Sequence, residues 1–578
     1  MYSLPGRKDT ALTEDRQPLP ATPLATPGKS FLAGACLLMV SLTGLMTYPQ
    51  VLHMRDGVDD AGDPLLNAWA LSWVAHQLPL APTRLFDGNI FHPEANTLAF
   101  SETLLAPALV VAPLRWLGVG AISVYNLVFL SGFALSGLGT VLLVYALTGQ
   151  RGAAVVAGII FAFLPYRMDH YAHLQLQQTQ FIPLTLWALH RLVESGRRRD
   201  GVLLGACVAG QLLSCTYYGI FMIPYLALMA VALLLNGRLS KTRAQDVVDL
   251  HLQLDVRGWR RRLVALAAGV AVCLVIAAPT GRAYLAARAL VGERGTEEVT
   301  NGSATWRNYL ATSEANVLYG RWSRPYGDPE RRLFAGVLPV LLALVALWPP
   351  LTRVRVAYAL GLLFALDMSL GFNGFSYRFF YENLLPFRAL RIPARMGLIV
   401  GFSLAVLAGH GVARVSGRLN PGRRALLAAV CSCLILYEYR SKPWDLTFVP
   451  TKAPVIYASL PSLAKDASSA VVELPIAQED PTYMYYSTFH WRPLLNGYSG
   501  FFPKSYGQVV EALKVFPSEG GFEALRSSGT RYLLVHGELM NWGRYRTLIA
   551  ALDGRQDVAL VARQPWEKSE ISLYELKR

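Results

Sequence analysis

Charged residues are scarce in this sequence, and the shortage excludes an ordinary soluble globule. Asp, Glu, Lys and Arg make up 16% of the 578 residues, whereas a soluble domain carries about 25%. Hydrophobic residues reach 53%, with a mean hydropathy of +0.32, and they gather in long runs. Because such runs are typical of membrane-spanning helices, we predict a polytopic α-helical membrane protein.

Cysteine is also rare, and the sequence signals of a soluble catalytic site are missing. The six cysteines all lie inside apolar runs, at positions 36, 207, 215, 273, 431 and 433. Because they lie inside apolar runs, we expect them to pack as small hydrophobic residues and not to form disulfides or bind zinc. The sequence contains no nucleophile triad and no glycine-rich phosphate loop, which argues against a hydrolase or an ATP-driven pump.

The formal net charge of +15 comes from basic residues that stand between apolar runs. This distribution is typical of topology signals and of contacts with anionic lipid, so we expect no nucleic-acid partner. Residues 1–29 are polar, proline-rich and basic, and we predict a cytoplasmic tail. The run at 30–52 is longer than the apolar part of a signal peptide, which predicts a retained first anchor.

The remaining apolar runs bring the prediction to about eleven membrane-spanning helices. They occupy residues 121–147, 152–165, 178–193, 201–217, 219–236, 262–279, 333–349, 353–371, 395–415 and 423–440. The short basic connectors between several of them are expected in the cytoplasm. Residues 53–120, 166–177, 280–332, 372–394 and the chain after 440 would then lie outside. For the loops to alternate in this way between the two sides, the apolar stretch at 104–118 must not cross the membrane. Pro107 and Pro113 interrupt it, and we expect it to lie along the outer face.

The chain after residue 440 differs in kind from the apolar region, and we predict an extracytoplasmic α/β domain over residues 441–578. Short β-branched runs at 468–476, 531–539, 557–565 and 571–577 predict strands. Apolar spacing typical of helices occurs at 505–516 and 544–554. The aromatic run at 484–502 allows two interpretations: it binds carbohydrate or covers a membrane cavity, or it belongs to the domain core.

Directly after the first anchor, four aspartates crowd into residues 56–63, namely Asp56, Asp59, Asp60 and Asp63. Clustered carboxylates raise one another's pKa, and they can hold a general base or bind a divalent cation. For Asp56 and Asp59 the alternative is a solvated loop position. No cofactor is certain from the sequence, and a divalent cation is the one candidate.

The helix that follows the acidic turn begins with an Asp-Pro pair, which predicts Asp63 as its N-cap. Leu66, Trp69 and Trp73 fall on one face of this helix. Such an aromatic stripe is suited to lying at the membrane interface. A cap also holds its carboxylate in a defined direction, so a capping role does not exclude chemistry for Asp63.

The order of these segments resembles that of the GT-C membrane glycosyltransferases, whose first outer loop carries an acid and then interfacial helices. Five stretches are similar to bacterial members of that superfamily: GDPLLNAWALSW, NIFHPEANTLAFSE, HLQLQQTQFIPL, FRALRIPARMG and STFHWRPLLNGYSGF. The resemblance implies a GT-C-like bundle at 30–440 in a bacterial cytoplasmic membrane. It also implies a polyprenyl-phosphate-linked sugar as donor, a lipid or glycan acceptor, and Asp63 as base with Asp60 or Asp59 assisting.

The leaving phosphate of such a donor needs cationic partners at the outer face. Arg388, Arg391 and Arg395 supply them, because the forked guanidinium group suits phosphate oxygens. The alternative is that these arginines reach lipid headgroups or pair with loop acids such as Glu382.

Further polar and aromatic side chains at the outer ends of the runs are candidates for substrate contact. We select His173, Gln175, Glu298 and Trp69. The polar groups at 170–178 could instead cross-link helices, and the spacing of His170 and His173 also allows weak metal ligation. The loop at 280–332 is equally compatible with ordinary packing at the membrane interface.

Two other classes of protein share many of these features. A transporter or flippase should carry paired charges midway through its spans, but here the charges gather at the outer span ends. A non-catalytic protein of envelope-polysaccharide assembly would share the fold, and only mutation would distinguish it from an enzyme.

Overall fold

The computed structural model describes residues 24–234, 256–460 and 469–577. Within these ranges, eleven helices occupy the eleven apolar runs that the sequence predicts as spans. They are α1 (Lys29–Met46), α4 (Ala121–Thr148), α5 (Arg151–Ala162), α8 (Phe181–Ser195), α9 (Arg198–Ser214), α10 (Thr216–Leu234), α11 (Val256–Val291), α14 (Val337–Leu347), α15 (Arg353–Ser369), α17 (Gly397–Ser416) and α18 (Pro421–Glu438). Six stretches among the described residues are long and apolar enough to cross a membrane, so the count of eleven spans stays a prediction.

The outward surfaces of several helices are apolar, as a lipid environment requires. Leu37, Leu274, Leu344 and Leu434, on α1, α11, α14 and α18, are each more than half exposed. A soluble protein rarely leaves so much apolar surface uncovered. The helices therefore form a bundle that is built to be surrounded by lipid.

Helices α9 and α11 approach so closely that only glycine fits between them. A Cβ added to Gly205 would lie 1.9 Å from the backbone oxygen of Gly269, and one on Gly201 would lie 1.8 Å from that of Ala265. Small residues permit this backbone contact, which stabilises helix pairs in membranes through dispersion forces.

The basic connectors meet at one end of the bundle, as the sequence predicts for loops on a common side. Gln150 donates to the carbonyl of Ala413, and Arg262 donates to that of Val193. Arg414 reaches the carbonyl of Trp348, and the chain before α1 bonds there through Ala25 and Ala146. That this end is cytoplasmic remains a prediction.

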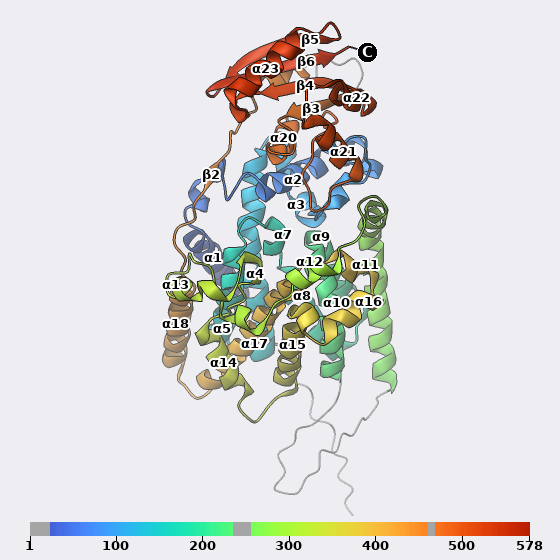
Figure 1. Cartoon of the computed structure of the whole chain (residues 1–578). Coiled ribbons are helices and arrows are strands. Elements are labelled where there is room, and N and C mark those ends of the chain that lie inside the picture. Colours follow the sequence, from blue (N-terminus) through green and yellow to red (C-terminus); the bar gives the residue numbers. More distant parts are fainter. Residues whose placement is uncertain (1–23, 235–255, 461–468, 578) are drawn as a thin grey trace, which may run out of the picture.

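At the opposite end, α2 (Asp63–Leu80) and α3 (Leu105–Trp116) lie between the bundle and the C-terminal segment (Figure 1). Residues 64–75 of α2 are all buried, because α3, α4 and the C-terminal segment cover them. Trp69 is 1% exposed and Trp73 is 5% exposed. The predicted placement of this aromatic stripe at the membrane interface is therefore wrong: protein, not headgroups, contacts it.

Short helices join the bundle to this end and surround the ends of its long helices. They are α6 (Pro165–Asp169), α7 (Leu174–Gln177), α12 (Thr296–Asn301), α13 (Gly320–Ser323), α16 (Ser376–Asn383) and the 3₁₀ turns η6 (Pro329–Arg331), η8 (Leu385–Ala389) and η9 (Pro393–Met396). Of these, η6 and η9 bring Glu330 and Arg395 near the first turn of α2, and the residue before α7 brings His173 there.

The C-terminal segment contains a four-stranded sheet of order β3–β4–β6–β5, covering the four stretches from which the sequence predicts strands. The strands are β3 (Ala470–Leu474), β4 (Thr530–His536), β5 (Val558–Trp566) and β6 (Ser569–Leu576). Strands β3 and β4 are parallel, and the other two pairs are antiparallel. Helices α20 (Asp480–Ser487), α21 (Lys504–Leu513), α22 (Glu519–Ser527) and α23 (Trp542–Asp553) complete the segment.

The two faces of this sheet belong to different cores. Val471, Leu534 and Leu573 point into the large core that continues through α20 and α2 to the bundle, whereas Val472 and Leu533 face a smaller core with α21 to α23. This alternation follows from the two-residue side-chain period of a strand. The sheet is therefore packed onto the end of the bundle and not separated from it.

Candidate active site

The carboxylate of Asp63 stands at the start of α2 and does not cap it. The N-cap position is Gly62, no side chain caps the helix, and Pro64 occupies the first turn as predicted. The expected N-cap role of Asp63 is therefore wrong. Asp60 instead accepts a hydrogen bond from the Gly62 N–H at 2.6 Å, which stabilises the turn.

Two side chains from distant parts of the sequence face Asp63. Tyr498, which follows α20, donates its hydroxyl to Oδ1 at 2.9 Å. The Nε2 atom of His173, which precedes α7, lies 3.5 Å from Oδ2. The side chain of Asp63 remains 26% exposed, so the carboxylate is both held in place and reachable.

The surroundings of Asp63 raise its pKa above the ordinary value of an aspartate. Burial is the largest cause, and the negative charge of Glu330 adds to it. The Tyr498 hydrogen bond and the positive charges of Arg395 and Arg391 oppose the rise. A carboxylate that binds a proton more readily than usual is better matched to general-base work near neutral pH.

His173 is a neutral partner and not a cation. Burial, together with the nearby charges of Arg395 and His170, lowers its pKa to about 3. Because Nε2 lies between the carboxylates of Asp63 and Glu330, at 3.5 and 4.0 Å, its proton belongs on that nitrogen. The imidazole can then orient Asp63 without neutralising it.

Glu330, in η6, lies next to His173 and forms an ion pair with Arg395 of η9. The two make paired hydrogen bonds of 2.7 and 3.2 Å, and His170 lies 3.3 Å from the same carboxylate. Burial opposes ionisation, but Arg395 and His170 hold the pKa of Glu330 well below its usual range. The guanidinium of Arg395 also lies over the Tyr217 ring at 4.8 Å. Arg395 is thus a buried, already paired cation.

Arg391 is an exposed arginine beside this pair. Its backbone N–H donates to the Tyr217 hydroxyl at 2.8 Å, which fixes the main chain. Its side chain is exposed and has no ion pair or hydrogen bond within the described ranges. Its charge nevertheless acts on Asp63. The structure therefore brings the acidic turn and two of the three predicted arginines together.

Arg388 is placed differently, and its contacts follow the alternative that the sequence left open. Its guanidinium donates to the backbone carbonyls of Tyr381 and Glu382 and lies 4.0 Å from Glu293. These bonds connect α16 to η8. Arg388 holds the loop that carries Arg391.

The other acids of the turn have separate environments. Burial, the charge of Asp60 and that of Asp445 raise the pKa of Asp59 to about 7, and a hydrogen bond from Tyr171 opposes the rise. Asp60 is exposed and bonds within the turn. The side-chain amides of Asn126 in α4 and of Gln50 both donate hydrogen bonds to the Gly57 carbonyl, each at 2.9 Å, and so fix the start of the turn.

The other residues predicted to contact substrate differ in how deeply they are buried. Gln175 is 8% exposed and accepts a hydrogen bond from Asn67 of α2. Glu298 is exposed and pairs with Arg294 at 3.4 Å. Trp69 donates to Asn89 at 2.9 Å inside the core. Its prediction as a substrate contact is wrong, because its ring packs against protein on all sides.

Glu330, Tyr498 and Tyr217 belong to the site, although the sequence did not single them out as functional. Tyr498 lies in the aromatic run at 484–502, most of which is buried core, and carbohydrate binding by that run stays a prediction. Tyr217 is positioned by Glu102, whose carboxylate accepts the N–H groups of Thr216 and Tyr217 at the start of α10. No local pattern announces these contacts.

Metal ligation was the other chemistry that the sequence allowed. Among the residues that the structure describes, no group of three or more His, Cys, Asp or Glu side chains is arranged to hold a metal ion.

Comparison with solved structures found similar folds. ArnT from Cupriavidus metallidurans bound to undecaprenyl phosphate is 13% identical, with 94% of this chain and 98% of that chain covered at a TM-score of 0.48. The archaeal oligosaccharyltransferase AglB from Archaeoglobus fulgidus, in complex with an inhibitory peptide and a dolichol-phosphate, is 12% identical at a TM-score of 0.42, with 88% of this chain and 69% of that chain covered. No protein-family model and no curated protein matches the chain. At this level of likeness the function has to be argued from the site itself.

Proposed function

We propose that this chain is a GT-C-type membrane glycosyltransferase. It transfers a sugar from a polyprenyl-phosphate-linked donor to a lipid or glycan acceptor at the outer face of the bacterial cytoplasmic membrane. The observation that carries the proposal is Asp63: a partly exposed carboxylate with a raised pKa, held by Tyr498 and His173 beside the exposed cation of Arg391.

The proposed reaction needs one base and one phosphate partner. The acceptor hydroxyl gives its proton to Asp63 while its oxygen forms a bond to the anomeric carbon of the donor. The bond from that carbon to the phosphate oxygen breaks, and the phosphate leaves with the electron pair. Arg391 then stabilises the growing charge on the phosphate, because its exposed guanidinium has no ion pair or hydrogen bond among the described residues.

Arg395 has a supporting part in this proposal. Its charge is compensated by Glu330, and it is 5% exposed. It therefore contributes positive potential to the site, but its paired N–H groups are not available to bind the phosphate. The carrier's polyprenyl tail would lie along the lipid-facing surface of the bundle.

The first test is the Asp63→Asn variant, assayed for sugar transfer from a set of polyprenyl-phosphate sugars. Loss of the base should lower turnover about 100- to 10,000-fold, the usual contribution of a general base. Asp56→Asn is the matched control, because Asp56 lies in the same turn and contacts His53 instead. Wild-type turnover by Asp63→Asn would remove Asp63 from its proposed role.

Native mass spectrometry of the purified protein addresses the donor independently of turnover. A co-purified polyprenyl phosphate that dissociates from Arg391→Gln but not from Arg307→Gln, which changes an exposed arginine of another loop, would support the phosphate site. Equal retention by both variants would contradict it.

A further inference from the structure

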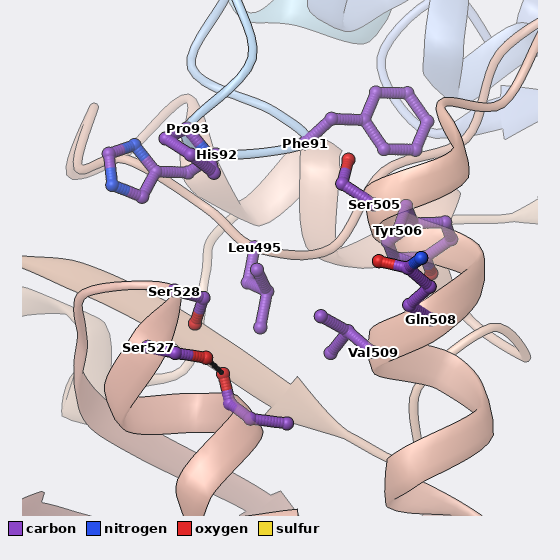
Figure 2. A pocket seen from close by; sticks show the side chains of 11 residues that line it. Phe91, His92, Pro93, Leu495, Ser505, Tyr506, Gln508, Val509, Ser527 and Ser528 are labelled. Carbon is purple, nitrogen blue, oxygen red and sulfur yellow. Dashed lines mark hydrogen bonds between the residues drawn. The ribbon is translucent and has the colours of Figure 1, made fainter.

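A cavity lies where the first outer loop meets the C-terminal segment, and Asp63 is not among the residues that line it. Its volume is about 360 Å³, within the range of about 300–1,000 Å³ that is usual for small-molecule sites. Figure 2 shows Phe91, His92 and Pro93 on one side and the side chains of α21 and α22 on the other. Cavities between packed units are common binding sites.

The residues that line this cavity indicate what kind of molecule it could bind. None of the lining residues is Asp, Glu, Lys or Arg. Leu495, Val509 and Pro93 provide apolar surface, and Gln508, Ser527 and His92 provide hydrogen-bonding groups. The lining therefore fits an uncharged molecule with both apolar C–H faces and hydroxyl groups.

Several polar side chains that line the cavity have hydrogen-bonding groups that the protein itself does not use. Ser527 donates its hydroxyl proton to the Ala524 carbonyl, which leaves the oxygen lone pairs available as acceptors. The Gln508 amide is exposed and makes no hydrogen bond within the described ranges. Burial lowers the pKa of His92, so its ring is neutral and offers one donor and one acceptor.

The walls of the cavity are fixed before any ligand arrives. Phe91 and His92 donate their backbone N–H groups to the carbonyls of Asn496 and Leu494, at 3.1 and 3.0 Å. Ser505 donates to Glu94 at 2.6 Å and joins the opposite wall to the same loop. Phe91 has a φ of +54°, a costly conformation for a side chain with a Cβ that only strong surrounding contacts maintain. Such preorganisation reduces the entropy lost on binding.

An aromatic cluster connects this cavity to the reaction centre. Tyr506 lines the cavity, and its ring lies 6.2 Å from that of Phe502. Phe502 lies 6.3 Å from Tyr498, whose hydroxyl bonds Asp63. An occupant of the cavity would thus be held by the same packed unit that positions the base.

We infer that the cavity between residues 91–93 and helices α21 and α22 is a binding subsite for a neutral saccharide unit of the acceptor, separate from the reacting hydroxyl. Its assignment to the acceptor rests on the proposed transferase function. The subsite would bind a distal sugar of a growing glycan and set the length or identity of the acceptor that reaches Asp63.

The experiment is saturation-transfer NMR on the purified full-length protein with free neutral di- and trisaccharides of glucose, galactose, mannose and N-acetylglucosamine. Ala524→Phe fills the cavity from α22, and Glu523→Phe places the same ring on the exposed side of that helix. We expect at least one saccharide to bind the wild type and Glu523→Phe. We expect its affinity to fall at least tenfold in Ala524→Phe.

Asp63→Asn separates this inference from the proposed function. It should bind the saccharide as the wild type does while losing transfer. If Asp63→Asn transfers sugar normally but the Ala524→Phe effect holds, Asp63 loses its proposed role as base and the saccharide site stands; if the wild type transfers no sugar but the Ala524→Phe effect holds, the transferase proposal fails and the saccharide site stands. Absence of binding by the wild type, equal binding by Ala524→Phe, or loss of binding in Asp63→Asn would each overturn the inference.

Discussion

At the scale of single residues, the acidic turn shows how neighbours in sequence acquire different chemistry. Asp60 is exposed and bonds its own turn, Asp59 is half-buried with a pKa raised to about 7, and Asp63 faces partners from other elements. Burial and charge, not residue type, separate them. The assignment of Asp63 as base therefore depends on contacts that the turn itself does not contain.

The Tyr498→Phe variant tests the hydrogen bond that holds Asp63. The Tyr498 hydroxyl favours the ionised carboxylate, so its removal should raise the pKa of Asp63 further. Since the base must be deprotonated, transfer falls as pH drops through that pKa. We expect the acid limb of the pH–rate profile to move up by about one pH unit.

Tyr485→Phe is a matched control for this measurement, because among the described residues the Tyr485 hydroxyl donates to the Pro450 carbonyl and not to Asp63. Its profile should coincide with that of the wild type. An unchanged acid limb in Tyr498→Phe would show that Asp63 does not govern the rate.

The Glu330→Gln variant should shift the same limb in the opposite direction. The charge of Glu330 raises the pKa of Asp63 and compensates Arg395, which lowers it. Without the negative charge, the field of Arg395 acts in full, and the limb should move to lower pH by up to about one unit. Thermal unfolding of the same sample checks that the glutamine preserves the fold. A shift to higher pH would contradict this electrostatic account.

At the scale of elements, the first turns of several helices are capped by acids that lie outside the helix itself. Glu102 accepts the first N–H groups of α10, Glu438 accepts those of Val337 and Leu338 at the start of α14, and Asp367 accepts those that begin α16. The first turn of a helix has unpaired N–H groups and a partial positive charge, so a carboxylate stabilises it. These acids fix the direction of helices that carry or support site residues.

Close contact between α9 and α11 is the second element-scale feature, and Gly205→Leu tests it. A leucine Cβ would overlap the Gly269 backbone, so the two helices must separate. We expect the free energy of unfolding to fall by about 1–3 kcal/mol or more, measured as a lower thermal midpoint in detergent. Val202→Leu, on the exposed side of α9, should leave the midpoint unchanged. A stable Gly205→Leu protein would mean that the helices are not in backbone contact.

At the scale of the whole molecule, the C-terminal sheet and the helical bundle form one packed unit at the site. The sheet gives one face to the bundle core, and Gly57 and Val58 of the acidic turn pair with Phe448 and Thr447 beyond α18. Asp63 is consequently held by parts of the chain that are more than 400 residues apart, as Asp63 and Tyr498 are.

The sheet also contains a buried charge that makes its stability depend on pH. Burial alone would lower the pKa of His536, but hydrogen bonds to Glu473 and Glu538, at 2.8 and 2.9 Å, raise it to about 9. A histidine with a raised pKa adds stability that is complete below its unfolded value near 6.5 and is lost as pH rises through 9.

His536→Gln should therefore destabilise the protein by about 3–5 kcal/mol near pH 6.5, since it leaves two buried carboxylates without their cation. The difference between wild type and variant should shrink between pH 8 and 10. Thermal unfolding across that range measures it, and His92→Gln, at a partly exposed histidine, serves as control. A difference that does not change with pH would show that His536 is not the charged partner.

The sequence by itself was sufficient to predict where most helices and strands lie. Hydrophobic runs and strand alternation are local properties, so the runs near α4, α10 and α17 and the four strands could be located without contacts. The acidic turn and the arginines near 390 could likewise be selected from residue type and position.

The tertiary structure decided which of these residues form a site. The N-cap prediction for Asp63 and the substrate prediction for Trp69 were wrong, because long-range packing gave Asp63 the partners Tyr498 and His173 and enclosed Trp69. Glu330 and Tyr498 carry no local signature, since the free energy that places them comes from contacts across hundreds of residues. Local pattern determines which elements form, whereas burial and charge in the assembled fold determine which carboxylate can act as a base.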